Sequence, residues 1–182
     1  TKLIQHNYEL HKQKEIAFAL GQRHADFHIK SNIVLEQDGF DHSAFSMNLD
    51  EMWNSTLEKK LSKWGSAIEP PMLSSIGGQK MLDELLAKVS RIEPLANYSL
   101  LHCDLLLRNT LIGEDDHINI IDFDTCMIGD PMYDLCKILW RDFLGGDSTL
   151  SKHYINGWQK NIGIPIDEEK IKLYTQLSCF AA

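Results

Sequence analysis

Three residues in the middle of the chain have the types and the spacing that a phosphate-handling cation site needs. Asp104 and Asn109 flank a loop between two apolar runs, and Asp122 directly follows the apolar run Ile118–Ile121. Carboxylate and amide oxygens are the ligands that Mg²⁺ prefers, and Mg²⁺ takes few of them from protein when phosphate oxygens are available. A carboxylate beside that ion can orient a hydroxyl group and accept its proton. The segment therefore predicts a magnesium site with a proton acceptor next to it.

A predicted β-hairpin brings these residues together. Thr110–Ile112 and His117–Ile121 have the pattern of two short strands, joined by a tight turn over Gly113–Asp116. Because the return strand runs beside the outgoing one, the loop before the first strand and the end of the second meet at one edge. Asp130 then favours a helix N-cap, with Pro131 at the first helical position.

The rest of the chain has the apolar periodicity of helices. Helices are expected over residues 8–28, 49–64, 82–92, 131–143, 150–158 and from 167 onward. Asn48 and Glu51 form a capping-box pattern, and the Glu69-Pro70-Pro71 segment is expected to end the second helix. The sequence predicts one α+β domain over residues 1–182, mostly helical with a small hairpin sheet.

Composition excludes several classes of protein. The 182 residues carry a net charge of −8, which disfavours a nucleic-acid binder. No apolar run approaches the length of about 18 residues that a membrane span needs, and the N-terminus lacks a secretory signal. The four cysteines have no zinc-site or paired spacing, so a reduced, cytoplasmic protein is expected.

The order of the motifs resembles the C-terminal lobe of aminoglycoside phosphotransferases and choline kinase-like enzymes, which are small-molecule kinases of the protein-kinase fold. The resemblance is carried by H-x-D-x-x-x-x-N from His102 to Asn109, a hairpin, I-D-F-D over 121–124, and G-D-P-x-x-D over 129–134. The five positions from Asp104 to Asn109 match the protein-kinase catalytic loop. The resemblance is sharp over this segment and looser elsewhere.

The resemblance implies a role for each charged or polar position of the loop. Asp104 is expected to be the catalytic base, which positions the hydroxyl of the acceptor. Asn109 and Asp122 are expected to hold Mg²⁺ against the phosphates of the nucleotide. His102 is expected to brace the backbone of the loop.

Five further residues receive expected roles from the same resemblance. Leu111 and Ile121 are expected to face the adenine or guanine ring of ATP or GTP. Asp134 is expected to hydrogen-bond the loop from the following helix. Asp124 is left open between a second acid near the metal and a hydrogen-bond acceptor in a turn. Arg108 either contacts phosphate or pairs with a surface acid, and the surface pair is favoured.

The sequence shows neither the glycine-rich strand turn nor the strand lysine of a kinase N-terminal lobe. We therefore expect that this lobe is absent, that the chain is truncated at both ends, and that residues 29–80 are a variable helical insert contacting the acceptor. The insert acids Asp38, Asp41, Asp50 and Glu51 are more simply explained as solvated surface groups.

The expected activity is transfer of the γ-phosphate to a hydroxyl group of a small molecule. The acidic balance favours a cationic acceptor such as an aminoglycoside, which would confer antibiotic resistance, while choline, an amino alcohol or a sugar remain open. A catalytically inert kinase-like binding module is the alternative of another class. A haloacid dehalogenase-type phosphatase with Asp122 as nucleophile is disfavoured, since Asp130 and Asp134 follow too closely. The oligomeric state is not predicted.

Overall fold

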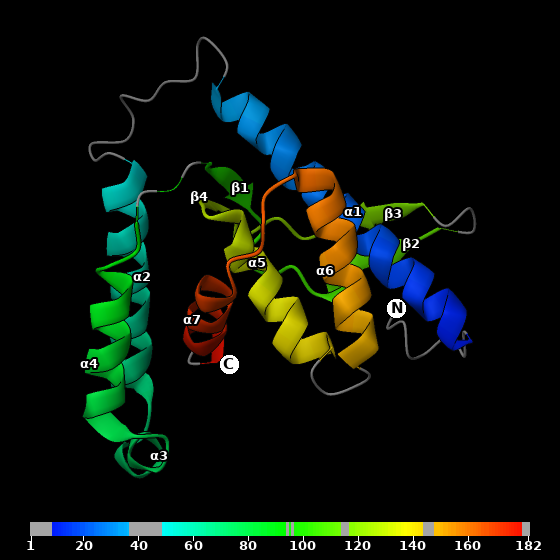
Figure 1. The fold of residues 1–182 in the computed structure, drawn as a ribbon. Helices are drawn as coiled ribbons and strands as arrows, with labels where there is room; N and C mark the ends of the chain where they lie inside the picture. Colours follow the sequence, from blue (N-terminus) through cyan, green and yellow to red (C-terminus); the bar gives the residue numbers. More distant parts are fainter. Residues whose placement is uncertain are drawn as a thin grey trace.

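The computed structural model describes residues 9–36, 49–93, 95, 97–113, 117–143 and 148–179. Figure 1 shows the arrangement of the elements. The helices are α1 (Leu10–Glu36), α2 (Leu49–Ala67), α3 (Pro70–Ser75), α4 (Gly78–Val89), α5 (Pro131–Ile138), α6 (Ser148–Ile162) and α7 (Glu168–Cys179). The strands are β1 (Ser99–Leu101), β2 (Thr110–Ile112), β3 (Ile118–Ile120) and β4 (Met127–Gly129). The predicted α+β class, mostly helical with little sheet, is confirmed.

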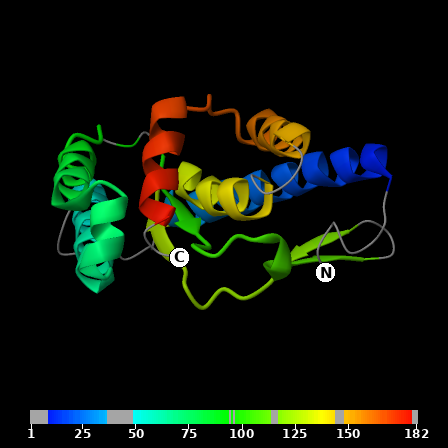
Figure 2. The ribbon, with the colours of Figure 1, turned by 90° about the horizontal axis from the view of Figure 1, so that it is seen from below.

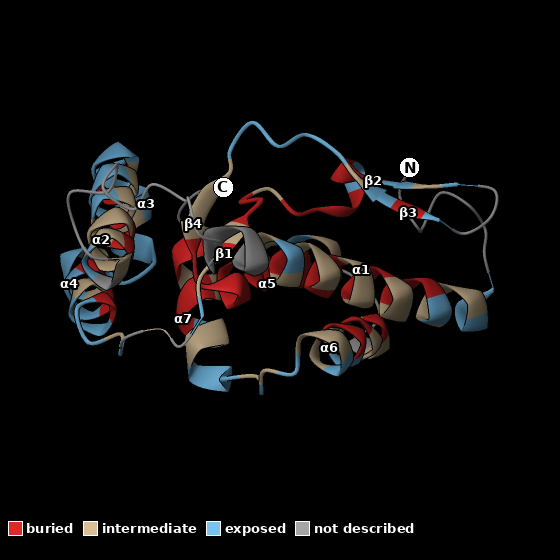
Figure 3. Cartoon of the chain, turned by 90° about the horizontal axis from the view of Figure 1, so that it is seen from above, coloured by how far each residue is buried: buried red, intermediate tan, exposed pale blue. Residues whose placement is uncertain are grey.

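Helices α1 and α6 pack closely along their lengths, and glycines allow the close approach. A Cβ atom on Gly21 would overlap the carbonyl oxygen of Tyr154, and one on Gly157 would overlap the carbonyl oxygen of Phe18. Helix α1 lies between α6 and the β2–β3 hairpin (Figures 2 and 3). It runs to Glu36, eight residues beyond the predicted end at residue 28, because the intervening sequence has no glycine or proline to stop it.

Helix α5 is the most buried helix of the domain, and α7 packs against it (Figure 3). Trp53 of α2 joins them, and its ring lies 5.3 Å from that of Tyr133 and 5.9 Å from that of Tyr174. The Trp53 indole donates to the Tyr174 hydroxyl at 3.2 Å, and that hydroxyl donates to Asp130 at 3.0 Å. Trp53 is therefore part of the core.

Helices α2, α3 and α4 form an arm at the opposite end of the domain from the hairpin (Figure 1). Trp53, Leu57 and Leu61 make the buried stripe of α2. The segment at Pro70 does more than end α2: Pro70 begins the short helix α3, since the first turn of a helix needs no amide hydrogen there. Helix α4 begins and ends earlier than predicted.

The strands form two separate antiparallel pairs. β2 pairs with β3, with Thr110 opposite Ile120, as the hairpin prediction requires. β1 pairs with β4, with Ser99 opposite Gly129, and this long-range pair was not predicted. Gly129 lies so close to the arm that a Cβ atom there would overlap the ring of Trp53.

Several expectations fall outside the described residues. They are the cap at Asn48, the insert acids Asp38 and Asp41, the turn at residues 114–116 and Phe180 of the last helix. Within the part of the chain that the structure describes, no helix is long and apolar enough to cross a membrane. Cys103, Cys126, Cys136 and Cys179 are free thiols.

Candidate active site

The carboxylate of Asp104 lies in the loop between β1 and β2, where three side chains donate to it. Its Oδ2 atom accepts from Arg108 at 2.6 Å and from Nδ2 of Asn109 at 3.0 Å. Its Oδ1 atom accepts from Nζ of Lys137, on α5, at 3.1 Å. The side chain is 15% exposed, so the carboxylate is sheltered but reachable.

The surroundings of Asp104 keep it ionised. Partial burial by itself would raise the pKa of its carboxyl group, but the hydrogen bonds and positive charges of Arg108 and Lys137 outweigh burial. The pKa therefore lies below its ordinary value, and Asp104 carries a negative charge at neutral pH. An ionised carboxylate with one oxygen less crowded than the other can accept a hydrogen bond from a hydroxyl group.

Asn109 is buried and its amide group is oriented by the loop. Its Nδ2 atom donates to the carbonyl oxygen of Asp104 at 2.8 Å as well as to the Asp104 carboxylate. Both amide hydrogens are thereby used, which leaves the Oδ1 atom as the group that can bind a cation.

The hairpin brings Asp122 beside this loop. The Ile121 amide donates to the carbonyl oxygen of Asn109 at 3.0 Å, which extends the β2–β3 pairing by one residue. Asp122 follows with a φ of 70°, a left-handed conformation that Asp adopts more readily than most residues. Its side chain is exposed, and its negative charge is near enough to help raise the pKa of Arg108. The loop and the strand end therefore meet as predicted.

Asn109 and Asp122 fit the chemistry of Mg²⁺. No group of three His, Cys, Asp or Glu side chains among the described residues could hold a metal. Mg²⁺ does not need such a group, because one or two protein oxygens beside phosphates suffice. Asp124 is exposed, and its two expected roles stay open.

Beneath the loop, the carboxylate of Asp134 holds its backbone. Asp134, in the first turn of α5, accepts from the amides of His102 at 2.6 Å and Cys103 at 2.7 Å. This is the contact that the resemblance implies. Cys103 has a φ of 62°, so the chain turns sharply at the point where these two amides converge. Asp130 caps α5 by accepting from the Met132 amide at 2.9 Å, as predicted.

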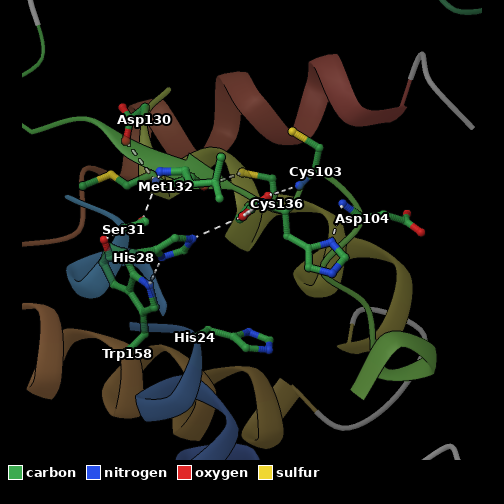
Figure 4. Close-up of polar contacts among 12 residues, drawn as sticks. His24, His28, Ser31, Cys103, Asp104, Asp130, Met132, Cys136 and Trp158 are labelled. Carbon is green, nitrogen blue, oxygen red and sulfur yellow. Dashed lines mark hydrogen bonds and ion pairs between the residues drawn. The ribbon is translucent and has the colours of Figure 1, made fainter. Parts of the chain in front are cut away.

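His28 of α1 hydrogen-bonds the buried carboxylate of Asp134, and no spacing in the sequence indicated this contact. The indole of Trp158 donates to Nδ1 of His28 at 3.2 Å, so the proton is on Nε2, which lies 3.2 Å from Asp134 (Figure 4). His28 and its neighbour His24 are both fully buried.

His102 connects the loop to the end of the hairpin. The Asp104 amide donates to its Nδ1 atom at 3.3 Å, and its Nε2 atom donates to the carbonyl oxygen of Ile121 at 2.8 Å. The Thr125 hydroxyl donates to the His102 carbonyl oxygen at 2.9 Å. The side chain thus spans the two segments that carry Asp104 and Asp122, which fits the bracing role expected of it.

Two features differ from simple expectation. Arg108 forms an ion pair, as favoured, but its partner is Asp104 itself rather than an unrelated surface acid. Lys137 was missed, because nothing in the sequence links a helix lysine to a loop 33 positions earlier.

Leu111, Ile121 and Phe123 are large apolar side chains left 46%, 39% and 44% exposed on the hairpin side. A face for a nucleotide base remains the prediction for the first two.

These features define a kinase-like C-terminal lobe, with a catalytic-type loop held above a buried carboxylate. The model of the phosphotransferase enzyme family matches residues 39–174, and the chain belongs to this family. No curated protein sequence matches the chain significantly.

Solved structures share the fold. An aminoglycoside-3'-phosphotransferase of type VIII superposes with a TM-score of 0.63 at 17% identity, covering 95% of this chain and 63% of that one. A macrolide 2'-phosphotransferase from Brachybacterium faecium gives 0.62 at 16% identity, covering 92% of this chain and 51% of that one. A choline kinase from Cryptosporidium parvum Iowa II gives 0.53 at 13% identity, covering 92% and 57%. The chain thus spans about half to two thirds of the length of these proteins.

Proposed function

We propose that this chain provides the catalytic loop of a phosphotransferase that moves the γ-phosphoryl group of ATP or GTP to a hydroxyl group of a small molecule. The observation that carries the proposal is the Asp104 carboxylate, sheltered, held ionised by Arg108 and Lys137, and bonded to Asn109. The kinase-like fold leaves a dehalogenase-type phosphatase without structural support.

Each residue of the site has a separate role in the proposed reaction. Asp104 accepts a hydrogen bond from the acceptor hydroxyl, orients its oxygen towards the phosphoryl group and takes its proton. Asn109 and Asp122 would hold Mg²⁺, which when bound screens the negative charge of the phosphates. Leu111 and Ile121 would offer apolar surface to the nucleotide base.

The identity of the acceptor is a separate question. The structures that share the fold are named for an aminoglycoside, a macrolide and choline, all small molecules with hydroxyl groups. The net charge of −8 favours a cationic acceptor. The positive charges nearest Asp104, on Arg108 and Lys137, favour an acceptor of a different class.

The test is transfer of phosphate from ATP by the full-length protein to a panel of aminoglycosides, macrolides, choline, sugars and hydroxy acids, with the product measured by mass spectrometry. We expect an acceptor that Asp104→Asn converts about 10²–10⁴-fold more slowly. Asp83→Asn is the matched control, since Asp83 is an exposed acid on α4 whose side chain accepts from Gln79.

Three results would overturn the proposal. A loss below about threefold for Asp104→Asn would remove the base assignment, since a positioned base is worth about 10²-fold at least. Absence of transfer to every acceptor would favour an inert binding module. Release of phosphate from small phosphoesters without ATP, with an acyl-phosphate on Asp122, would identify a phosphatase.

A further inference from the structure

Lys60 is a second lysine near Lys137, the lysine that bonds the expected catalytic base Asp104. Its partly buried position has a free-energy cost for a charged group. Lys60 occupies the side of α2 that faces β4 and α5, three residues after the buried Leu57. Its Nζ atom lies 3.2 Å from the Met127 sulfur and 5.2 Å from the centre of the Tyr133 ring. Among the described residues, no carboxylate lies within ion-pair distance of it. A thioether is a weak acceptor, so a large part of the cost of sheltering this ammonium group is uncompensated.

Lys60 and Lys137 lie over one face of α5. Lys60 sits over Tyr133, and Lys137 is four residues further along the same helix, which places it one turn away on the same side. The two positive charges affect each other: burial, and then the charge of Lys137, lower the pKa of Lys60, against the opposing effect of Cys103 and Asp134. The two amines are therefore close enough for their positive charges to interact, although Lys137 also pairs with Asp104.

The pair lies on the side of Asp104 away from the expected metal ligands. Arg108 and Asn109 occupy Oδ2 of Asp104, and the hairpin with Asp122 is on that side. Lys137 bonds the other oxygen, Oδ1, from α5. Helix α2 and the hairpin stand at opposite ends of the domain (Figure 1). In an in-line transfer the acceptor approaches opposite to the leaving group of the nucleotide, which places it on the lysine side.

We propose that Lys60 and Lys137 bind an anionic group of the acceptor, a carboxylate or a phosphate, next to the hydroxyl that Asp104 orients. This inference rests on the proposed function. The acceptor is then a hydroxy acid or a hydroxylated phosphate ester rather than a polyamine. The local charges take precedence over the net charge of −8, because ions further apart than about 8–10 Å are largely screened at physiological salt.

The anion site is tested without any turnover. Pyridoxal 5'-phosphate and pyridoxal are aldehydes that form an imine with a lysine amine and release water; borohydride fixes the adduct, and mass spectrometry locates it. We expect the phosphate-bearing reagent to label Lys60 or Lys137 in the full-length protein about tenfold faster than pyridoxal does, since charge-assisted hydrogen bonds are worth that factor or more. Lys59, the exposed neighbour on α2, should react equally with both reagents. If pyridoxal 5'-phosphate and pyridoxal label Lys60 and Lys137 at equal rates, the proposal is overturned.

Turnover tests the same site in matched acceptor pairs. The pairs are 4-hydroxybutyrate with its amide, and ribose 5-phosphate with ribose, with kanamycin as the polycationic arm. We expect kcat/KM to favour the anionic member about tenfold, and Lys60→Met to reduce this preference mainly through KM. Lys137→Met should reduce the preference as well, but it should also lower kcat because it removes a partner of Asp104. Lys60→Arg should restore it, and Lys59→Met should leave it unchanged, which separates binding from a structural effect.

The outcomes distinguish the two proposals. If no acceptor is phosphorylated but the phosphate reagent still prefers these lysines, the phosphotransferase proposal fails and the anion site stands. If kanamycin is the best acceptor and its kcat/KM is insensitive to Lys60→Met, the phosphotransferase proposal stands and the anionic acceptor is wrong.

Discussion

The catalytic loop has a lower side, which faces the buried Asp134, and an upper side, which carries the more exposed Asp104, and the two are built in different ways. On the lower side, the carboxylate of Asp134 is 2% exposed and accepts from two loop amides, with His28 as a third partner. On the upper side, Asp104 and Arg108 are partly or largely exposed, and the charge of Asp122 stands in solvent. The turn at Cys103 separates the two sides.

The difference shows how the loop can be both rigid and chemically available. Both oxygens of Asp134 accept hydrogen bonds from the protein itself, so this carboxylate shapes the backbone. Asp104 and Asp122 keep oxygen atoms that a substrate or a cation can approach. We therefore expect substitutions below the loop to lower stability, and those above it to lower turnover at unchanged stability.

The largest expected effect is below the loop. Asp134→Asn keeps the shape of the side chain but replaces one acceptor oxygen with an amide that points hydrogens at a donor. We expect the free energy of unfolding to fall by about 3–5 kcal/mol, the cost of breaking a buried charged network, as measured by urea denaturation. The exposed Asp83→Asn on α4 should change it by less than about 0.5 kcal/mol. A loss below about 1 kcal/mol for Asp134→Asn would mean that the lower side does not hold the loop.

The second largest expected effect is a loss of turnover caused by a substitution on the upper side of the loop. We expect Asp122→Asn to lower the rate of phosphate transfer about 10²–10³-fold, since it weakens a group that stabilises developing charge. The thermal unfolding midpoint should stay unchanged, because the side chain is exposed. The Mg²⁺ concentration for half-maximal activity should rise in the variant.

Asp124→Asn makes a matched control for this substitution, two residues further along the same exposed segment. A loss near that of Asp122→Asn would place Asp124 at the metal, and a small loss would assign it to the turn. A destabilised Asp122→Asn protein would contradict the division between the two sides.

A smaller effect on stability is expected from the helices that carry the lower side. His28 lies on α1 and Trp158 on α6, and the contact at Gly21 sets how closely these helices approach. A glycine to alanine change inside a helix ordinarily stabilises by about 1 kcal/mol. Here the added Cβ meets the backbone of Tyr154, so Gly21→Ala should instead destabilise by about 1–3 kcal/mol in urea denaturation. A stabilised variant would show that the helices are not in close contact.

The sequence predicted the parts of this arrangement that depend on neighbouring residues. The hairpin, the cap at Asp130 and the helix at Pro131 follow from local propensity and turn chemistry, and the loop follows from its spacing. Helix α1 ran longer than predicted because periodicity marks the packed face but not the end of a helix. Pro70 was interpreted as a stop, although proline is equally suited to a first helical turn.

The contacts between distant segments could not be predicted in this way. The β1–β4 pair joins residues about thirty positions apart, and strands of three residues have too little pattern to identify a partner. His28, Trp158, Lys60 and Lys137 surround the loop or its supports from four different helices, and each looks like an ordinary helix residue in the sequence. Their positions follow from how the helices pack, which local propensity does not encode.

The smallest expected effect concerns the protonation of Asp104. Arg108 is 56% exposed and its hydrogen bond and charge help to hold the pKa of Asp104 below the ordinary value, so Arg108→Ala should raise that pKa without lowering stability measurably. Asp104 must be ionised to accept a proton, so activity falls as the pH drops through its pKa. The acidic limb of the profile of kcat/KM against pH should therefore move to higher pH in the variant.

Salt provides the internal control for this shift, because it screens the exposed Arg108–Asp104 pair. Raising the ionic strength should move the acidic limb of the unmodified protein towards that of Arg108→Ala, and should move the variant less. Arg91→Ala, at an exposed site near the end of α4, should have an unchanged profile. An acidic limb that stays in place in Arg108→Ala would mean that Lys137 alone keeps Asp104 ionised, and the upper side would then depend on α5 rather than on the loop's own arginine.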